Sequence, residues 1–145
     1  MMLKNFTSML LILAMAAFVG GCGEEEEPTP EEKWGSDTQS VRVMLFRDGT
    51  VVRALNEFRM NSGKYPTTDQ GLDALLNRPK GLEPREWRGP YMESEEHFTD
   101  KWGNTLRYAC PGKTYPDEPN RFDLWSLGPD GADGTDDDIL NHNVK

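Results

Sequence analysis

The sequence has few of the residues that most often carry catalysis or covalent cross-links. Its 145 residues include two cysteines and two histidines. His97 and His142 are far apart, and neither has a serine or cysteine motif beside it, which argues against a catalytic pair. Acidic residues outnumber basic ones by 25 to 16, and the net charge of -9 disfavours nucleic acid and anionic membrane surfaces as partners. We therefore expect no enzyme and no small-molecule substrate.

Long hydrophobic runs are also absent, apart from one near the start of the chain. Residues 6–19 are mostly apolar, follow Lys4 and end in the sequence VGGC at 19–22. The run is shorter than the roughly 20 residues that a membrane-spanning helix needs. A basic residue before it and small residues after it predict a lipoprotein signal peptide over residues 1–21. VGGC resembles a bacterial lipobox, and this resemblance implies cleavage before Cys22 and a diacylglyceryl group on its thiol.

Residues 22–33 are rich in glutamate and proline and contain the stretch GEEEEPTPEE. Such a composition cannot bury a core and predicts a flexible tether between a lipid and a domain. We expect a membrane-anchored lipoprotein facing the periplasm or the cell surface. By analogy with lipoprotein sorting, Gly23 favours the outer membrane over the inner one. The other reading of this end is a cleaved signal with an unmodified Cys22.

Residues 34–145 are long enough for one domain with one modest core. If Cys22 carries lipid, Cys110 has no partner within the chain, so no disulfide is expected. Cys110 ends the alternating segment LRYAC at 106–110, and we expect it to be a small buried residue. Three tryptophans, Trp87, Trp102 and Trp125, each sit beside a turn signal, which favours packing over a ligand cage.

Helical spacing of apolar residues predicts a helix over residues 50–63, ended by Gly63. The segment 41–47 either extends this helix or forms a strand, because Asp48 and Gly49 interrupt the pattern; we favour a helix. The remaining candidate elements are short.

Thr67 and Gln70 have the spacing of a capping box, which predicts a second helix of about ten residues ended by Pro79. The segments 106–110 and 121–127 read as strands, paired antiparallel across residues 113–120.

The last twenty residues contain five carboxylates within nine positions. Two carboxylates about 4 Å apart near a surface repel by roughly 4 kcal/mol. Apolar residues on both sides tie this stretch to a core, so a freely solvated acidic tail is the weaker reading. Oxygen ligands and sharp glycine turns suit Ca²⁺, and no cysteine or histidine lies among these nine positions to recruit a softer metal. The carboxylates are those of Asp130, Asp133, Asp136, Asp137 and Asp138.

Five motifs in one order resemble the C-terminal globular domain of the major pseudopilin of type II secretion, the general secretion pathway protein G family. The resemblance covers roughly residues 50–143. It implies an α+β, pilin-like head: an N-terminal helix, a short second helix, a small antiparallel sheet and a C-terminal calcium-binding loop. The motifs are KYPTTDQGLDALL (64–76), EPREWRGPYM (83–92), TDKWGNTLRYACPG (99–112), RFDLWSLGPDG (121–131) and DDDI (136–139).

The resemblance also implies a ligand set for Ca²⁺. By position, the side-chain ligands fall on Asp130, Asp137 and Asp138, and the backbone carbonyl ligands on Leu127 and Thr135. Asp133 and Asp136 do not match ligand positions; they add negative charge or substitute for a ligand.

The chain departs from this family at its front. A pseudopilin has a long apolar helix with glutamate at its fifth position, where this chain has Leu10, and the apolar run here stops at Gly20 and Gly21. We therefore expect a lipid anchor in place of a polymerising helix, and we expect no filament.

Two function classes follow from these observations. The first is a non-catalytic, calcium-stabilised structural component in or near a protein secretion apparatus, whose partners are secretion machinery or other pseudopilin-like subunits. The second is a stand-alone periplasmic or surface binding module without a role in secretion. The sequence does not name the protein partner.

Overall fold

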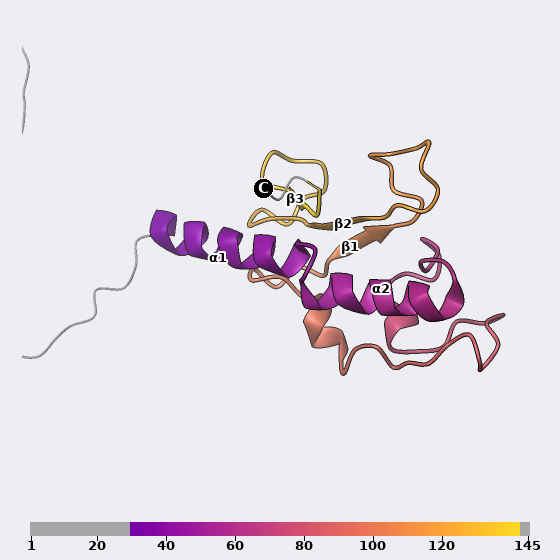
Figure 1. The fold of residues 1–145 in the computed structure, drawn as a ribbon. Coiled ribbons are helices and arrows are strands. Elements are labelled where there is room, and N and C mark those ends of the chain that lie inside the picture. The colour runs from indigo at the N-terminus through magenta and orange to yellow at the C-terminus, as the bar shows by residue number, and fades with distance from the viewer. Residues whose placement is uncertain (1–29, 143–145) are drawn as a thin grey trace, which may run out of the picture.

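The computed structural model describes residues 30–142, which form an α+β fold, as predicted. Two α-helices come first, followed by two short 3-10 helices and then three short strands (Figure 1). Their bounds are α1 Pro30–Leu45, α2 Thr50–Ser62, η1 Leu72–Leu75, η2 Glu95–Phe98, β1 Arg107–Ala109, β2 Asp123–Ser126 and β3 Ile139–Leu140.

The helices α1 and α2 follow one another nearly in line, with a tight turn between them (Figure 1). The helix predicted over residues 50–63 is confirmed, and Gly63 ends it in the left-handed conformation with its N–H bonded to the Arg59 carbonyl. Residues 41–45 are helical, as favoured, but they belong to α1. That helix begins at Pro30, inside the range 22–33 predicted to be tether, whereas Cys22 and the signal peptide lie outside the described residues.

The predicted second helix of about ten residues is wrong. The capping box exists: the Thr67 N–H donates to Gln70 Oε1 at 2.9 Å, and the Gln70 N–H donates to Thr67 Oγ1 at 3.3 Å. However, Gly71 then adopts φ 59° and ψ -164°, and an α-helix cannot continue through a residue with this backbone conformation. Only one turn of 3-10 helix, η1, follows it, and that turn ends four residues before Pro79.

The sheet is antiparallel with the order β1-β2-β3. The predicted pairing of the segments around β1 and β2 is confirmed, with Tyr108 opposite Leu124. The strand β3 was not predicted as a strand; it pairs with β2 through Ser126 and Ile139. Beyond β3, Asn141 clamps Leu124 from both sides: its N–H donates to the Leu124 carbonyl at 2.9 Å, and its Oδ1 accepts from the Leu124 N–H at 3.2 Å.

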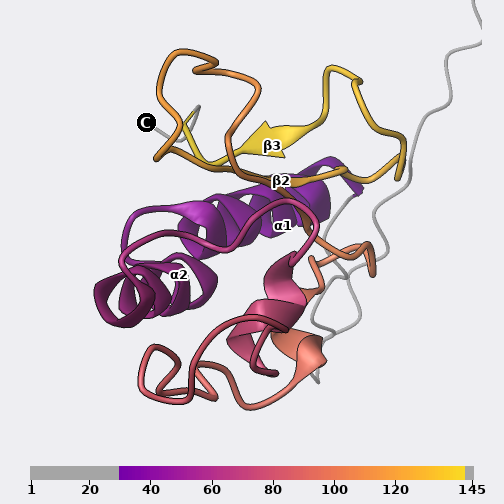
Figure 2. The same ribbon diagram turned by 90° about the vertical axis from the view of Figure 1, so that its right-hand side faces the viewer.

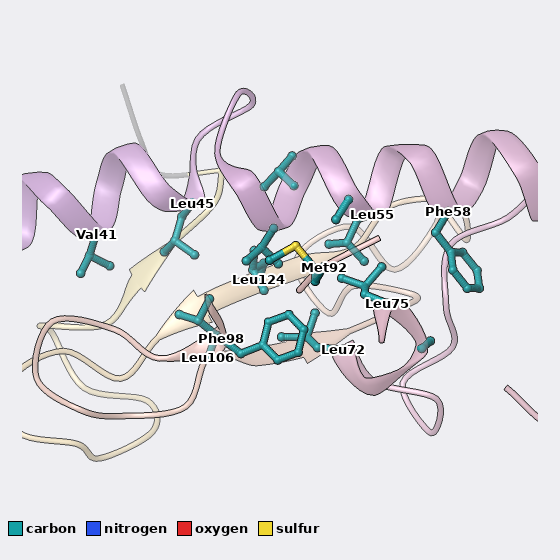
Figure 3. Packing of buried hydrophobic residues seen from close by; sticks show 14 of the residues in the cluster. Val41, Leu45, Leu55, Phe58, Leu72, Leu75, Met92, Phe98, Leu106 and Leu124 are labelled. Atoms are coloured by element: carbon teal, nitrogen blue, oxygen red, sulfur yellow. The ribbon is translucent and has the colours of Figure 1, made fainter. Parts of the chain in front are cut away.

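The core lies between the helices and the rest of the chain. α1 packs along β2 and β3, while α2 packs on η1 and η2 (Figures 1 and 2). Figure 3 shows Val41 and Leu45 of α1 and Leu55 of α2 pointing to one side, toward Leu124 on β2. Leu124 is fully buried, so both helices help to shield the middle of the sheet from water.

Residues 30–142 contain no helix that is both long and apolar enough to cross a lipid bilayer.

Candidate metal-binding loop and family assignment

Residues 127–138, the acidic loop, connect β2 to β3 in the antiparallel hairpin. Buried residues hold both of its ends, because Leu127 and Ile139 are 5% and 7% exposed. The aspartates between them are exposed or half-buried. The prediction that apolar residues tie this acidic stretch to the core is therefore confirmed.

Two of the predicted ligands, Asp130 and Asp137, are brought together. The Asp130 N–H donates to Asp137 Oδ2 at 3.1 Å. The Thr135 hydroxyl lies 2.6 Å from Asp137 Oδ1 and 3.4 Å from Asp130 Oδ1, so one hydroxyl stands between the two carboxylates. Its single hydrogen serves one acceptor at a time, and the shorter contact assigns it to Asp137.

These contacts change the acidity of Asp137. The Thr135 hydroxyl and, after it, the Asp130 N–H hold the pKa of the Asp137 carboxyl below its ordinary value. A lowered pKa keeps a carboxylate ionised, which is the form that binds a metal ion.

The third predicted ligand, Asp138, directs one oxygen at the backbone: the Gly134 N–H donates to Asp138 Oδ2 at 2.7 Å. Its other oxygen, Oδ1, is buried and has no hydrogen-bond partner. A buried carboxylate oxygen without a partner is costly, and a cation is one group that would satisfy it.

The two predicted carbonyl ligands are placed differently. The Thr135 carbonyl accepts a bond from the Asp138 N–H at 3.3 Å, which leaves its second lone pair free. Leu127 is at the start of the loop, next to Gly128, which has φ 65°. A Cβ on Gly128 would lie 2.5 Å from Asp137 Oδ2, so the chain passes this carboxylate at a distance that only glycine permits.

The remaining aspartates differ from each other. Asp133 accepts a hydrogen bond from the indole Nε1 of Trp125 at 2.8 Å, a contact that the sequence did not predict. This bond fastens the tip of the loop to β2. Asp136 is exposed.

A hydrogen-bond network around the buried Asp100, which the sequence did not predict, supports the start of the acidic loop. Asp100 is 7% exposed and accepts bonds from the Ser126 hydroxyl at 2.6 Å and from the N–H groups of Trp102 and Asn104. The Asn104 amide donates to the Gly128 carbonyl at 2.8 Å. Asp100 and Asn104 belong to the motif at 99–112, but their roles depend on a contact 24 residues along the chain, which no local pattern predicts.

Within the described part of the chain, no three histidine, cysteine, aspartate or glutamate side chains lie close enough to form a metal site by themselves. The donors that are present still fit a hard cation. Asp130 and Asp137 converge on one hydroxyl, and Asp138 Oδ1 lacks a partner. All are oxygens, as Ca²⁺ prefers.

Other candidate residues occupy structural positions. Cys110 is buried, as expected, and burial raises the pKa of its thiol. Trp87 donates to the Ala74 carbonyl at 2.9 Å, and Trp102 packs against the core. His142 Nδ1 lies 3.9 Å from Asp123 Oδ1.

Comparison with known proteins agrees with the predicted resemblance. The profile of the family described as type II secretion system (T2SS), protein G, matches residues 47–142. This range covers α2, the sheet and the acidic loop, and it agrees with the predicted extent of roughly 50–143.

Individual relatives carry the same description. The type II secretion system core protein G of Aeromonas hydrophila is 43% identical over 94 residues, which cover 63% of this chain and 61% of that protein. The corresponding protein of Vibrio cholerae serotype O1 is 38% identical over 96 residues, with the same two coverages. The chain thus spans about three fifths of the length of these relatives.

A solved structure matches the fold as well. It is the crystal structure of the major pseudopilin from the type 2 secretion system of enterohaemorrhagic Escherichia coli. The match has a TM-score of 0.60 and 32% identity, and it covers 78% of this chain and 92% of that one. The chain belongs to the type II secretion system protein G family.

Proposed function

We propose that this chain is a non-catalytic structural subunit of a type II secretion apparatus, acting through contacts of its head with other protein subunits. The match over residues 47–142 supports this role most directly, because it includes the whole sheet and the acidic loop. Relatives with this region are type II secretion system core proteins by name.

A secretion assay in the protein's own organism tests the proposal. Deleting the gene is expected to lower export of a type II substrate at least tenfold, and the full chain is expected to restore it. Unchanged export in the deletion strain would favour the stand-alone binding module. An export control that uses another secretion route separates a specific loss from general damage to the envelope.

We propose further that the acidic loop binds one Ca²⁺ through the carboxylates of Asp130, Asp137 and Asp138 and the carbonyls of Leu127 and Thr135. The shared Thr135 hydroxyl, the lowered pKa of Asp137 and the partnerless Asp138 Oδ1 support this ligand set. The ion would stabilise the fold, because a ligand that binds only the folded state raises the free energy of unfolding by RT ln(1 + [L]/Kd).

Thermal melting of the full chain in Ca²⁺, in Mg²⁺ and in chelator tests the ion. Free Ca²⁺ at a hundred times Kd raises the free energy of unfolding by about 2.7 kcal/mol. With roughly 4–8 °C per kcal/mol for a domain of this size, Ca²⁺ is expected to raise the melting temperature by at least about ten degrees. Three equal curves would remove the metal site.

The anchor is proposed separately. Cys22 in VGGC would carry the lipid, and the head would face the periplasm or the cell surface, with the outer membrane favoured. The mass of the mature protein extracted from membranes distinguishes lipidation, plain signal cleavage and pilin-type processing. A Cys22→Ser protein that keeps the wild-type mature mass and still partitions into detergent would refute the anchor.

The same reading predicts no polymerisation by this chain alone, because Leu10 stands where the family has glutamate. Overexpression beside a prepilin peptidase is expected to give no filaments. Pili labelled by antibody against the head would contradict it.

A further inference from the structure

A groove at the junction of α1 and α2 carries a concentration of positive charge that contrasts with the acidic chain. Its volume is about 480 Å³, and none of its lining residues is acidic. This is unexpected for a protein with 25 acidic and 16 basic residues. We call it the arginine groove; its basic lining residues are Arg47, Arg59, Arg121 and His142.

The basic residues come from four separate places in the fold. Arg47 follows α1, and Arg59 is in the last turn of α2. Arg121 precedes β2 and His142 follows β3. Because β2 and β3 are antiparallel, Arg121 and His142 meet at the end of the hairpin that is opposite to the acidic loop.

Two of the guanidinium groups are held against aromatic rings. Arg121 lies over the ring of Tyr115, 3.7 Å from its centre, and Arg59 lies over the ring of Tyr65 at 5.1 Å. Cation–π contact holds a guanidinium by its face. One N–H group of Arg59 donates to the Tyr65 hydroxyl at 3.3 Å, and its other N–H groups can bind an acceptor. The groove therefore holds partly oriented donors.

Acidic neighbours neutralise this charge only weakly. Arg121 pairs with Glu118 at 3.2 Å, but both side chains are about half exposed, and such pairs contribute little. The carboxylate nearest to His142 is that of Asp123, which is 4% exposed and so lies behind the wall of the groove. Of the described ion pairs, none involves Arg47 or Arg59.

We propose that the arginine groove binds an acidic peptide, and that its occupant is the glutamate run at residues 24–27 of another copy of this chain. Guanidinium groups bind carboxylates through paired, charge-assisted hydrogen bonds. The groove is open and lined by side-chain amides as well as arginines, which suits an extended chain that presents several carboxylates.

The whole glutamate run of the same molecule cannot lie in the groove. The fifteen steps from Pro30 to Leu45 along α1 span about 22 Å at 1.5 Å per residue. Glu27 is three residues before Pro30, and three residues extend to about 11 Å at most. The groove begins at Leu45 and continues toward α2, so an occupant that brings all four carboxylates into it must come from a second molecule.

Peptide binding measured by fluorescence anisotropy tests the proposal. The receptor is the full chain with Glu24, Glu25, Glu26 and Glu27 each replaced by glutamine, so that no run of its own competes. The labelled probe GEEEEPTPEE is expected to bind at least tenfold more tightly than GQQQQPTPQQ, and its affinity should fall with added salt.

Variants locate the site. Adding Arg47→Gln and Arg121→Gln is expected to weaken binding of the glutamate probe at least tenfold. Arg53→Gln is the matched control, since Arg53 is exposed on α2 and does not line the groove. Melting temperatures within about two degrees of the parent confirm that the variants fold.

Three results would overturn the proposal: no binding, equal binding of both probes, or equal affinity of the groove and control variants. Displacement of the probe by inorganic phosphate at the probe's own concentration would indicate a small-anion site and not a peptide site. The wild-type chain should also self-associate in low salt, and the glutamine-substituted chain should not. A wild-type chain that stays monomeric in low salt would refute the glutamate run of a second copy as the occupant. None of these measurements needs a secretion apparatus, so their failure is separate from failure of the proposed function.

Discussion

The acidic loop and the arginine groove occupy opposite ends of one β2–β3 hairpin and carry opposite charge. In the acidic loop, contacts within twelve consecutive residues hold the carboxylates, chiefly through backbone N–H groups and the Thr135 hydroxyl. In the arginine groove, two of the guanidinium groups lie on aromatic rings, and the charged groups come from positions as distant as Arg47 and Arg121. One region is built locally, and the other exists only in the folded chain.

This difference sets what each region can do. Like charges that are close together favour a ligand of opposite charge, and the geometry decides its size. The tight loop suits a single ion, whereas the open groove suits an extended peptide. Substitutions at the two ends of the hairpin should therefore respond to different additives.

The largest expected effect is at Leu124 on β2, which lies between the acidic loop and the arginine groove. Leu124→Ala removes a fully buried side chain from the middle of β2 and should cost about 2–5 kcal/mol of unfolding free energy. Urea unfolding measures it, and the loss should be the same with Ca²⁺ and with chelator. Val43→Ala, at a position 62% exposed, is the control and should change little. A loss at Leu124 that Ca²⁺ abolishes would mean that the two ends are not independent.

The next effect is confined to the acidic loop. Asp137→Ala should abolish the Ca²⁺-dependent increment, about 2.7 kcal/mol at saturating ion, because one charged ligand is lost. Melting temperatures with Ca²⁺ and with chelator report it. The exposed Asp136 gives the matched control, and Asp136→Ala should keep the increment. Equal Ca²⁺ responses in both variants would refute the ligand set.

A smaller effect is expected at the tip of the loop. Asp133→Ala removes the bond from the Trp125 indole and should cost about 1 kcal/mol or less, with or without Ca²⁺. Trp125→Phe removes the same hydrogen bond from the other side. Chemical unfolding of both single variants and the double variant checks the pair, and additive losses would show that the two residues do not act together.

The groove should contribute still less to folding. Arg121→Gln breaks only an exposed ion pair with Glu118 and is expected to change the unfolding free energy by less than about 1 kcal/mol. Urea unfolding of the variant beside wild type measures this. A larger loss would show that the arginine supports the fold and would weaken its assignment to peptide binding.

The smallest effect is expected in acid. The pKa of Asp137 is lower in the folded chain, so its contribution is present above the ordinary aspartate pKa of about 4 and is lost as the pH falls through the folded value. In chelator, wild type should therefore lose slightly more stability between pH 5 and pH 2 than Asp137→Asn. Parallel curves would contradict the lowered pKa.

Local sequence patterns predicted much of the fold. The helix over residues 50–63 and the strand pair followed from local patterns. α2 places its apolar side chains on one buried face, whereas β2 buries the polar Asp123 and Ser126 beside Leu124. The prediction of the second helix was wrong because a capping box indicates only where a helix starts. It carries no information on Gly71, whose backbone conformation is not helical.

The candidate sites divide in the same way. The acidic cluster was readable from the sequence, whereas the choice of Asp130 and Asp137 within it came from the resemblance to the protein G family. The bond between Trp125 and Asp133 depends on how the loop closes, and no local pattern encodes it. The arginine groove was missed because a lone arginine is ordinarily solvated surface, and only tertiary packing gathers four basic side chains around one groove.

The clamp that Asn141 places on Leu124 gives the acidic loop a fixed length. Sliding β3 by one residue would turn Ile139 out of the core and break both bonds of the clamp. A residue added to or removed from the loop therefore cannot be absorbed by the strands. If the change lies between Asp130 and Asp137, it alters the separation of these two residues, so it acts directly on the geometry offered to an ion while the sheet keeps its pairing.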